Sequence, residues 1–395
     1  MAITTSDYLN QLRTDKQDLV DNLTAKGISG LTGDETFTEL VPEVLNIPSG
    51  GGESEGWQRP SDWWDTKDIL DNAQEISGLY PIFIVLYDDT QDTSGFHTNT
   101  TPKSSADAYL TSDGVWYNTK DFTHTWDKTK DRECSEGYKT RYIIAYASDK
   151  TAVSYVSGNT TNVLEVIFND VTISGIAVNG NSSLKNFDFY KGSFPIFSTS
   201  SAFNDCYSLK RVSLPSIVTL TGTNIFNTCP NLEEIDLPDL VDSTSSKLFG
   251  TLPSLKKLNI PKLESLRSVI SGLYNLKKLS MPSFTTSTNT GGSFLNLYSL
   301  EEFVFPPTFT TFDSGYSFSG CYNLRKVVFY QGFKLNNISF RESPLYHDTM
   351  VDMFNKLADV TGESTTYSLS LGGTNLAKLT SAEQAIATNK GWTLG

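Results

Sequence analysis

A repeat of about 23 residues constrains the fold of this 395-residue chain more than any other feature. Leucine anchors recur at intervals of 21 to 25 residues. The anchors are Leu184, Leu209, Leu232, Leu255, Leu276, Leu300 and Leu324. Positions three and five residues after each anchor are apolar, and proline stands at the sixth position in five repeats. A single unit of this kind cannot bury its apolar side, so the period predicts a stack of units around a shared core.

Each unit contributes a short strand, and the apolar residues six and three positions before the anchor close the core from the opposite wall. Cys206, Cys229 and Cys321 share the third position before the anchor with three leucines. We therefore interpret these cysteines as small buried hydrophobic residues and not as nucleophiles. Cys134 lies outside the array and has no assignment.

The pattern F-x-x-C-x-x-L-x-x-[VIL]-x-[LIF]-P occurs at Phe203–Pro215 and at Phe226–Pro238. It resembles the BspA-like leucine-rich repeat family, over about residues 160–340. That resemblance implies an interaction scaffold and no enzyme. The expected fold class is α+β and mostly β: a helical N-terminal module, a small β-rich domain, a leucine-rich-repeat solenoid of about seven repeats, and an α/β C-terminal cap.

Residues 1–47 differ from the repeats and precede a Gly/Ser-rich linker at residues 48–56. Apolar residues at helical spacing predict an amphipathic helix, followed by a second apolar cluster. The residues predicted to mediate attachment or oligomerisation are Leu9, Leu12, Leu19, Leu23, Phe37 and Leu40. So small a module needs a partner surface or copies of itself; the alternative is packing against its own chain.

The N-terminal residues, including Glu35-Thr-Phe-Thr-Glu-Leu-Val41-Pro, resemble the N-terminal module of tail-fibre or minor structural proteins of bacteriophages. The resemblance implies attachment to other virion proteins through residues 1–47. We expect a homo-oligomer, with a trimer favoured. The start of the sequence carries no export signal, so we expect a virion protein that is made in the host cytoplasm and released by lysis.

Residues 57–159 hold five of the six tryptophans and predict a small β-rich domain. The opening Trp57–Asp65 resembles a segment recurrent in phage structural proteins. Clustered indole rings offer flat apolar faces on which sugar rings can stack. The candidates are Trp63, Trp64 and Trp116. The alternative is that these rings belong to the core.

Residues 160–343 are the expected solenoid, and residues 344–395 change period again. Helical spacing over 347–358, alternation over 367–371 and a second helical stretch over 381–389 predict an α/β unit. Because a solenoid exposes the apolar side of its last repeat, this unit is expected to cap it.

Charge and motifs exclude several functions. Acidic residues outnumber basic ones 45 to 31, and the net charge is −14, which disfavours nucleic-acid binding. No apolar run is long enough for membrane insertion. The three histidines show no metal-ligand spacing, no phosphate loop or nucleophile motif occurs, and no cofactor is expected. The acidic pairs Asp88-Asp89 and Glu233-Glu234 are expected in a turn and on a solvent-facing strand position. A depolymerase with acids far apart in the chain stays open.

Two neighbouring rungs carry like charges, at Lys256, Lys257, Lys277 and Lys278. Like-charged neighbours repel unless an anion lies across them. We therefore predict an anionic ligand such as a wall polymer there; the alternative is a solvated face with Glu264 nearby.

The sequence as a whole favours a non-enzymatic phage fibre protein that binds a glycan or protein of the host cell surface. The alternatives are a head fibre or capsid decoration protein, and a bacterial surface adhesin whose export signal lies upstream. Genes beside the coding sequence would distinguish the three.

Overall fold

The computed structural model describes residues 56–88, 96–97, 106–118, 123–151, 153–156, 162–189, 192–193, 196–244, 248–266, 270–287, 294–309 and 318–395. All of them belong to the second of the chain's two units, Gly56–Gly395. The residues predicted to mediate attachment, from Leu9 to Leu40, lie outside the described part of the chain.

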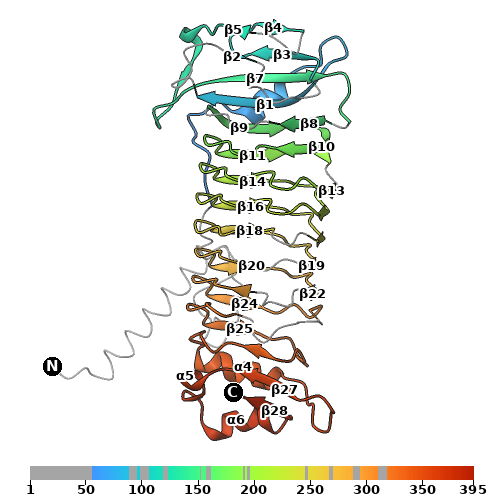
Figure 1. Cartoon of the computed structure of the whole chain (residues 1–395). Coiled ribbons are helices and arrows are strands. Elements are labelled where there is room, and N and C mark those ends of the chain that lie inside the picture. Colours follow the sequence, from blue (N-terminus) through green and yellow to red (C-terminus); the bar gives the residue numbers. More distant parts are fainter. Residues whose placement is uncertain are drawn as a thin grey trace, which may run out of the picture. The chain divides into compact units, whose positions relative to one another are not determined.

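The largest sheet joins two kinds of strand (Figure 1). The antiparallel strands are β1 (Tyr80–Asp88), β3 (Ala108–Thr111), β4 (Trp116–Tyr117), β6 (Arg132–Glu133), β7 (Lys139–Ala147) and β9 (Val163–Phe168). The parallel strands are β11 (Asn186–Phe189), β14 (Arg211–Ser213), β16 (Glu234–Asp236) and β18 (Lys257–Asn259). Strand β9 pairs antiparallel with β1 and parallel with β11. The predicted boundary at residue 160 therefore falls within one hydrogen-bonded sheet.

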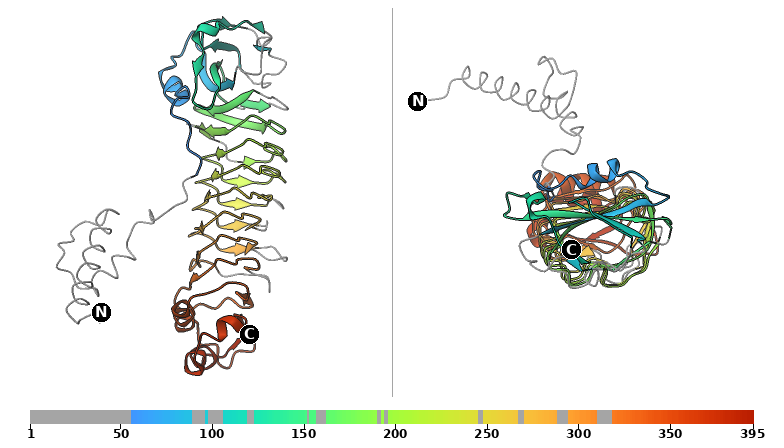
Figure 2. Two further views of the ribbon diagram at one scale, coloured as in Figure 1. Left: turned by 90° about the vertical axis from the view of Figure 1, so that its left-hand side faces the viewer. Right: turned by 90° about the horizontal axis from the view of Figure 1, so that it is seen from above.

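The repeats form a β-solenoid in which each turn adds one rung to the stack (Figure 1). After β18 a separate three-stranded sheet continues the stack, with β21 (Lys278–Leu279), β24 (Glu302–Val304) and β25 (Lys326–Val328). Seen from above, the turns superpose around a common axis (Figure 2). Each strand of the three-residue rungs β14, β16 and β18 ends two residues before its proline, because proline has no N–H to donate to the ladder.

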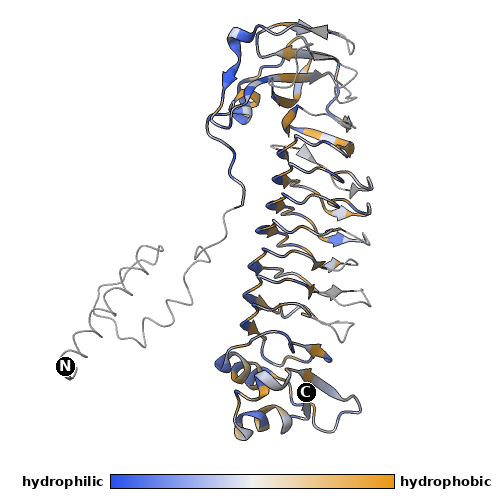
Figure 3. Ribbon diagram, turned by 60° about the vertical axis from the view of Figure 1, so that its left-hand side comes forward, coloured by the Kyte–Doolittle hydropathy of each residue, from blue (hydrophilic) through white to orange (hydrophobic). Residues whose placement is uncertain are grey.

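Short strands also form the other walls. A five-stranded sheet contains β13 (Ile196–Phe197), β15 (Thr219–Leu220), β17 (Asp242–Ser243), β19 (Ser265–Leu266) and β22 (Thr286–Ser287). Smaller ladders contain β8 (Val153–Val156), β10 (Val171–Ala177), β12 (Gly192–Ser193), β20 (Ile270–Ser271) and β23 (Phe294–Leu295). A separate pair, β2 (Phe96–His97) and β5 (Thr123–His124), lies near β3 and β4 at the N-terminal end (Figure 1). Hydrophilic residues recur along one edge of the stacked turns, and hydrophobic residues lie elsewhere in the same turns (Figure 3).

The predicted core positions are confirmed. All seven anchor leucines have 0% exposure. Phenylalanines six positions before the anchor stack from turn to turn, with Phe203 and Phe226 5.4 Å apart at their ring centroids. Identical residues at identical repeat positions thus form continuous columns, which is how a stack of short units builds one core.

The cysteine prediction is also confirmed. Cys206, Cys229 and Cys321 are buried and unbridged. The Cys229 thiol donates to the Phe203 carbonyl of the preceding turn at 2.8 Å. Burial raises the pKa of the Cys206 thiol to about 12, so the thiolate needed for nucleophilic chemistry does not form at neutral pH.

The C-terminal unit covers the last turn, as the sequence predicts. It contains α4 (His347–Lys356), α5 (Gly373–Leu376) and α6 (Ser381–Thr388), with β26 (Ile338–Ser339), β27 (Tyr367–Ser370) and β28 (Trp392–Leu394). Met350, Met353 and Phe354 of α4 are buried. Lys390 donates its ammonium hydrogens to carbonyls at the end of α4, which satisfies acceptors that a helix leaves open.

At the other end, helix α3 (Thr66–Asn72) lies on the face of the antiparallel strands that points away from the main core. Its Leu70 packs with Ile84, Ile144 and Ile167. A 3₁₀ turn, η1 (Lys128–Lys130), completes this end. None of the helices in the described ranges has the length and apolar character needed to cross a bilayer.

Candidate binding site on the repeat sheet

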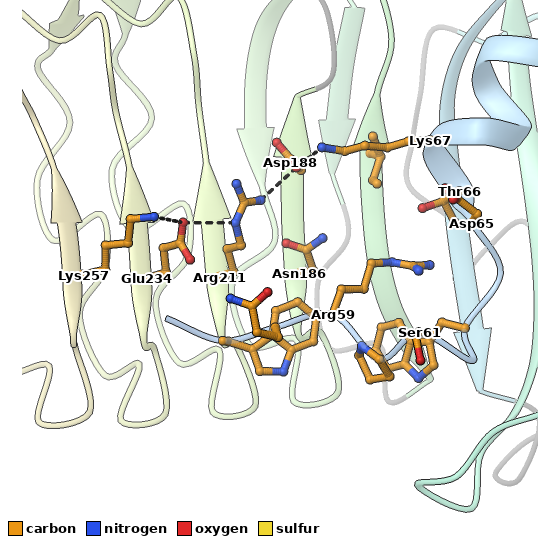
Figure 4. Close-up of a pocket in the computed structure, with 15 residues that line it drawn as sticks. Arg59, Ser61, Asp65, Thr66, Lys67, Asn186, Asp188, Arg211, Glu234 and Lys257 are labelled. Atoms are coloured by element: carbon orange, nitrogen blue, oxygen red, sulfur yellow. Dashed lines mark hydrogen bonds and ion pairs between the residues drawn. The ribbon is translucent and has the colours of Figure 1, made fainter. Parts of the chain in front are cut away.

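A segment at residues 56–67, which we call the strap, lies against the outward face of the first repeat strands (Figure 4). Gly56 stands so close to β16 that an added Cβ would lie 2.5 Å from Glu234 Oε2. Arg59, three residues later, contacts Glu165 of β9. The strap therefore crosses from β16 to β9, and a side chain at its first residue would push the Glu234 side chain aside.

A fully buried carboxylate holds the strap. Glu165 has 0% exposure. Arg59 donates to it from Nε at 2.7 Å and from Nη2 at 3.1 Å. Thr66 Oγ1 donates at 2.6 Å, and Asn186 Nδ2 donates at 2.8 Å. A buried charge is stable only when it is paired and hydrogen-bonded. Glu165 meets that condition, because Arg59 pairs with its charge, and Thr66 and Asn186 also donate hydrogen bonds to it.

Charges of alternating sign continue along the rungs beside the strap (Figure 4). Lys67 and Arg211 contact Asp188 at 3.0 and 2.8 Å. Glu234 forms ion pairs with Arg211 at 3.4 Å and with Lys257 at 3.6 Å. Burial alone would lower the pKa of Arg211, but Asp188 and Glu234 raise it above its ordinary value. The row forms because parallel strands in register place Arg211, Glu234 and Lys257 directly side by side.

This arrangement corrects one expectation. Glu234 was expected to face solvent but is only 7% exposed. The side chain of its neighbour Arg211 is 21% exposed. Sequence periodicity places both residues outside the solenoid core, as observed, but it gives no sign that the strap covers that outer face.

A cavity of about 550 Å³ lies between the strap and the rungs. Its lining comprises Trp57, Gln58, Arg59, Pro60, Ser61, Trp63, Asp65, Thr66, Lys67, Ile167, Asn186, Asp188, Arg211, Glu234 and Lys257. Two buried polar atoms of lining residues have no hydrogen-bond partner in the described structure: Asn186 Oδ1 and Trp63 Nε1. Asn186 is 3% exposed and Trp63 is 1% exposed. Unpaired buried polar groups are costly, so each requires an explanation.

The four lysines predicted to bind an anion do not form one continuous rung pair. Lys256 contacts Glu233 at 2.6 Å, and Lys257 contacts Glu234. Lys277 lies 3.6 Å from Glu301 on the far side. The strand that carries Lys278 pairs with β24 and not with β18. Three of these lysines thus turn toward acidic rungs, which removes the like-charge repulsion behind the anion hypothesis.

The three candidate tryptophans do not share one exposed surface. Trp63 is buried, and its ring packs 6.0 Å from that of Trp57. Trp64 donates its Nε1–H to the Thr140 carbonyl at 3.0 Å. Trp116 is 38% exposed on β4, at the end of the sheet. The sequence prediction included Trp63, which lines the cavity, but missed Trp57, the other indole there, although it lies in the same quoted motif.

A column of tyrosines lines another side of the solenoid, each two residues before an anchor leucine. The rings of Tyr274 and Tyr298 stack at 4.6 Å, and those of Tyr298 and Tyr322 at 5.6 Å. Tyr298 is 38% and Tyr322 57% exposed. Tyr207 occupies the same repeat position and is 49% exposed. The anchor spacing, read two residues upstream, would have revealed this column in the sequence.

No cluster of metal-ligating side chains occurs among the residues that the structure describes. His347 contacts Asp348 at 2.7 Å and Glu383 at 3.0 Å, and those carboxylates raise its pKa. Glu233 lies between Lys210 and Lys256, with its pKa lowered: burial opposes this change, and the hydrogen bonds from both lysines outweigh burial. These groups form structural ion pairs between neighbouring elements.

Comparison with known sequences identifies the repeat. Residues 155–270 and 264–346 match the profile described as a BspA type leucine rich repeat region, in 6 copies. A crystal structure of a leucine-rich repeat protein from T. pallidum is similar over 58% of this chain and 90% of that chain, with 17% identity and a TM-score of 0.26. A similarity at that TM-score carries no argument about fold or function. No curated protein sequence matches the chain.

Proposed function

From the premise that residues 155–346 are a BspA-type leucine-rich repeat region, we propose that the chain is a non-enzymatic fibre protein of a bacteriophage particle. Its repeat region and the adjoining antiparallel sheet bind the surface of the host cell. Repeat folds of this type serve as binding scaffolds, because stacking creates long surfaces whose exposed positions vary freely.

The tyrosine column carries the binding part of this proposal. Tyr298 and Tyr322 contribute nothing to the solenoid core, yet aromatic residues recur at their repeat position. Stacked rings cover one another's faces and leave their edges and hydroxyls to solvent. Tyrosine is enriched at protein recognition surfaces because it combines a rigid apolar body with a polar tip. A recurring, solvent-exposed aromatic column is better suited to recognition than to solubility.

The particle part of the proposal depends on residues 1–47, which resemble the attachment module of phage fibre and minor structural proteins. In this proposal the module binds other virion proteins and assembles copies of the chain, with a trimer favoured. The protein is thus located on the virion. The competing assignments are a head fibre or capsid decoration, for which the repeats contact only the particle, and a bacterial surface adhesin.

The test is binding of the fluorescently labelled full chain to intact cells of a bacterial panel. Strain-selective binding is expected, and the double variant Tyr298→Ser/Tyr322→Ser should weaken it at least about tenfold, equivalent to 1.4 kcal/mol. Val304→Ser is the matched control, because Val304 is 50% exposed on a sheet strand away from the column. Absence of binding to every strain by a folded chain would favour a decoration protein.

A further inference from the structure

We propose that the cavity between the strap and strands β9 to β16 binds a neutral saccharide unit. This inference deepens the proposed function, because it assigns a ligand class and a second contact point to a host-binding protein. It rests on three properties of the cavity: its mixed hydrogen-bonding lining, its internally balanced charges, and its size with the partly exposed Trp57 ring.

The accessible lining calls for a ligand that both donates and accepts hydrogen bonds. Among the lining side chains that are not buried, Gln58 and Ser61 each carry a donor and an acceptor, Asp65 accepts, and the Arg and Lys side chains donate. A phosphate or carboxylate can only accept, and an ammonium group can only donate. A hydroxyl does both. A molecule with several hydroxyls therefore matches this mixed lining, whereas a simple ion pairs either with the donors or with the acceptors.

The charges at the cavity are already balanced. The lining cations are Arg59, Lys67, Arg211 and Lys257, and the lining anions are Asp65, Asp188 and Glu234. Glu165, which holds Arg59, balances the fourth cation. A charged ligand would add a charge that no group of the lining compensates. A neutral ligand can instead hydrogen-bond to the remaining lone pairs and N–H groups without disrupting any pair.

The size and shape of the site fit a small ring. The volume of about 550 Å³ lies within the range of roughly 300 to 1,000 Å³ found for small-molecule sites. Of the lining side chains, only Trp57, Trp63, Pro60 and Ile167 are apolar. Trp63 and Ile167 are buried, so Trp57 and Pro60 supply the apolar contact, and the indole of Trp57 offers a flat apolar face to the C–H face of a sugar. An extended peptide would require deeper apolar pockets for its side chains than these four residues provide.

The experiment is saturation-transfer NMR of the full chain with methyl glucoside, methyl galactoside and methyl N-acetylglucosaminide. Glucuronate, glucosamine, inorganic phosphate and a trialanine peptide serve as charged and peptide comparators. We expect transfer to at least one neutral glycoside, and Trp57→Ala should weaken its affinity about tenfold. Tyr346→Ala is the matched control, since Tyr346 is 56% exposed in the C-terminal cap.

A second variant pair keeps the proposal testable if Trp57→Ala loosens the strap. Lys257→Met removes a donor at the cavity, and Lys262→Met removes an exposed lysine with a similar single acidic partner, Asp239. The first should weaken glycoside binding, and the second should not. No transfer to any neutral glycoside up to about 10 mM, where even weak sites are occupied, would overturn the proposal. Preferential binding of an ion or the peptide would also overturn it.

These outcomes separate the inference from the proposed function. If the chain binds no glycoside but still binds cells through the tyrosines, the saccharide site is contradicted and the host-binding proposal stands. If the chain binds a glycoside but no bacterial strain, the saccharide site stands and the host-binding proposal is contradicted.

Discussion

The two ends of the solenoid are closed by different physical means. At the N-terminal end the repeat sheet continues without interruption, since β9 pairs parallel with β11 on one side and antiparallel with β1 on the other. At the C-terminal end the chain leaves the sheet, and α4 packs against β25 with buried Met350, Met353 and Phe354. At the N-terminal end further strands pair with the open edge of the repeat sheet, and at the C-terminal end a helix covers that edge.

The difference has an energetic consequence. The N-terminal end depends on a buried carboxylate, for which the loss of a donor is costly. The C-terminal end depends on apolar packing and helix caps, whose individual contributions are smaller. We therefore expect point substitutions of polar residues to be far more damaging at the N-terminal end.

The largest expected effect tests that buried carboxylate. Glu165→Gln removes the charge that compensates Arg59 and should lower the free energy of unfolding by about 3 kcal/mol. The lower end of the usual range applies because the Arg59 side chain is 26% exposed. Urea unfolding monitored by tryptophan fluorescence measures the change, since five of the six tryptophans lie at this end.

The matched control for that variant is Glu133→Gln. Glu133 contacts Lys139 at 3.2 Å, but its side chain is 78% exposed, so its loss should cost less than about 1 kcal/mol. Equal effects of the two substitutions would contradict the difference that we draw between the ends.

An intermediate effect is expected at the C-terminal end. Thr380 forms a capping box with Glu383 at the start of α6. Thr380→Ala should cost about 1 kcal/mol, seen as faster hydrogen exchange in α6 with no change in β9. Thr388→Ala, at the exposed end of the same helix, is the control and should be neutral. Faster exchange in β9 would mean that the two ends unfold together.

The smallest expected effect is a pH dependence of the stability of the C-terminal unit, where His347 of α4 contacts Glu383 of α6. Hydrogen bonds to Asp348 and Glu383 raise the pKa of His347 above 6.5. Protonated His347 therefore stabilises the cap fully below pH 6.5, and the contribution disappears as pH rises through the raised pKa. The melting temperature of the chain should therefore fall slightly as the pH rises above 6.5. His347→Gln should remove that part of the fall, and an unchanged profile would exclude His347 as its source.

The repeat was predictable because its information is local and periodic. Leu209, Leu232 and Leu255 mark successive turns, and the residues at fixed offsets from them are apolar in every unit. Stacking leaves only one way to bury such a pattern. The burial of Cys229 and the helix at 347–356 followed from the same kind of reasoning.

The candidate site was not predictable, because it depends on contacts between distant residues. Glu165 is 106 positions from Arg59, and nothing in the local sequence indicates that they meet. Lys257 was predicted to lie beside another lysine rung, yet it contacts Glu234 at the edge of the cavity. Local charge patterns reveal which residues face outward, but not what covers them.

The sequence by itself determined the solenoid, its core columns and its C-terminal cap, since each follows from periodic apolar positions that must be buried. Only the tertiary structure decided that the antiparallel strands extend the repeat sheet and that the strap encloses a polar cavity over it. Those features arise from pairing and charge compensation between segments far apart in the chain, and such pairings leave no period in the sequence.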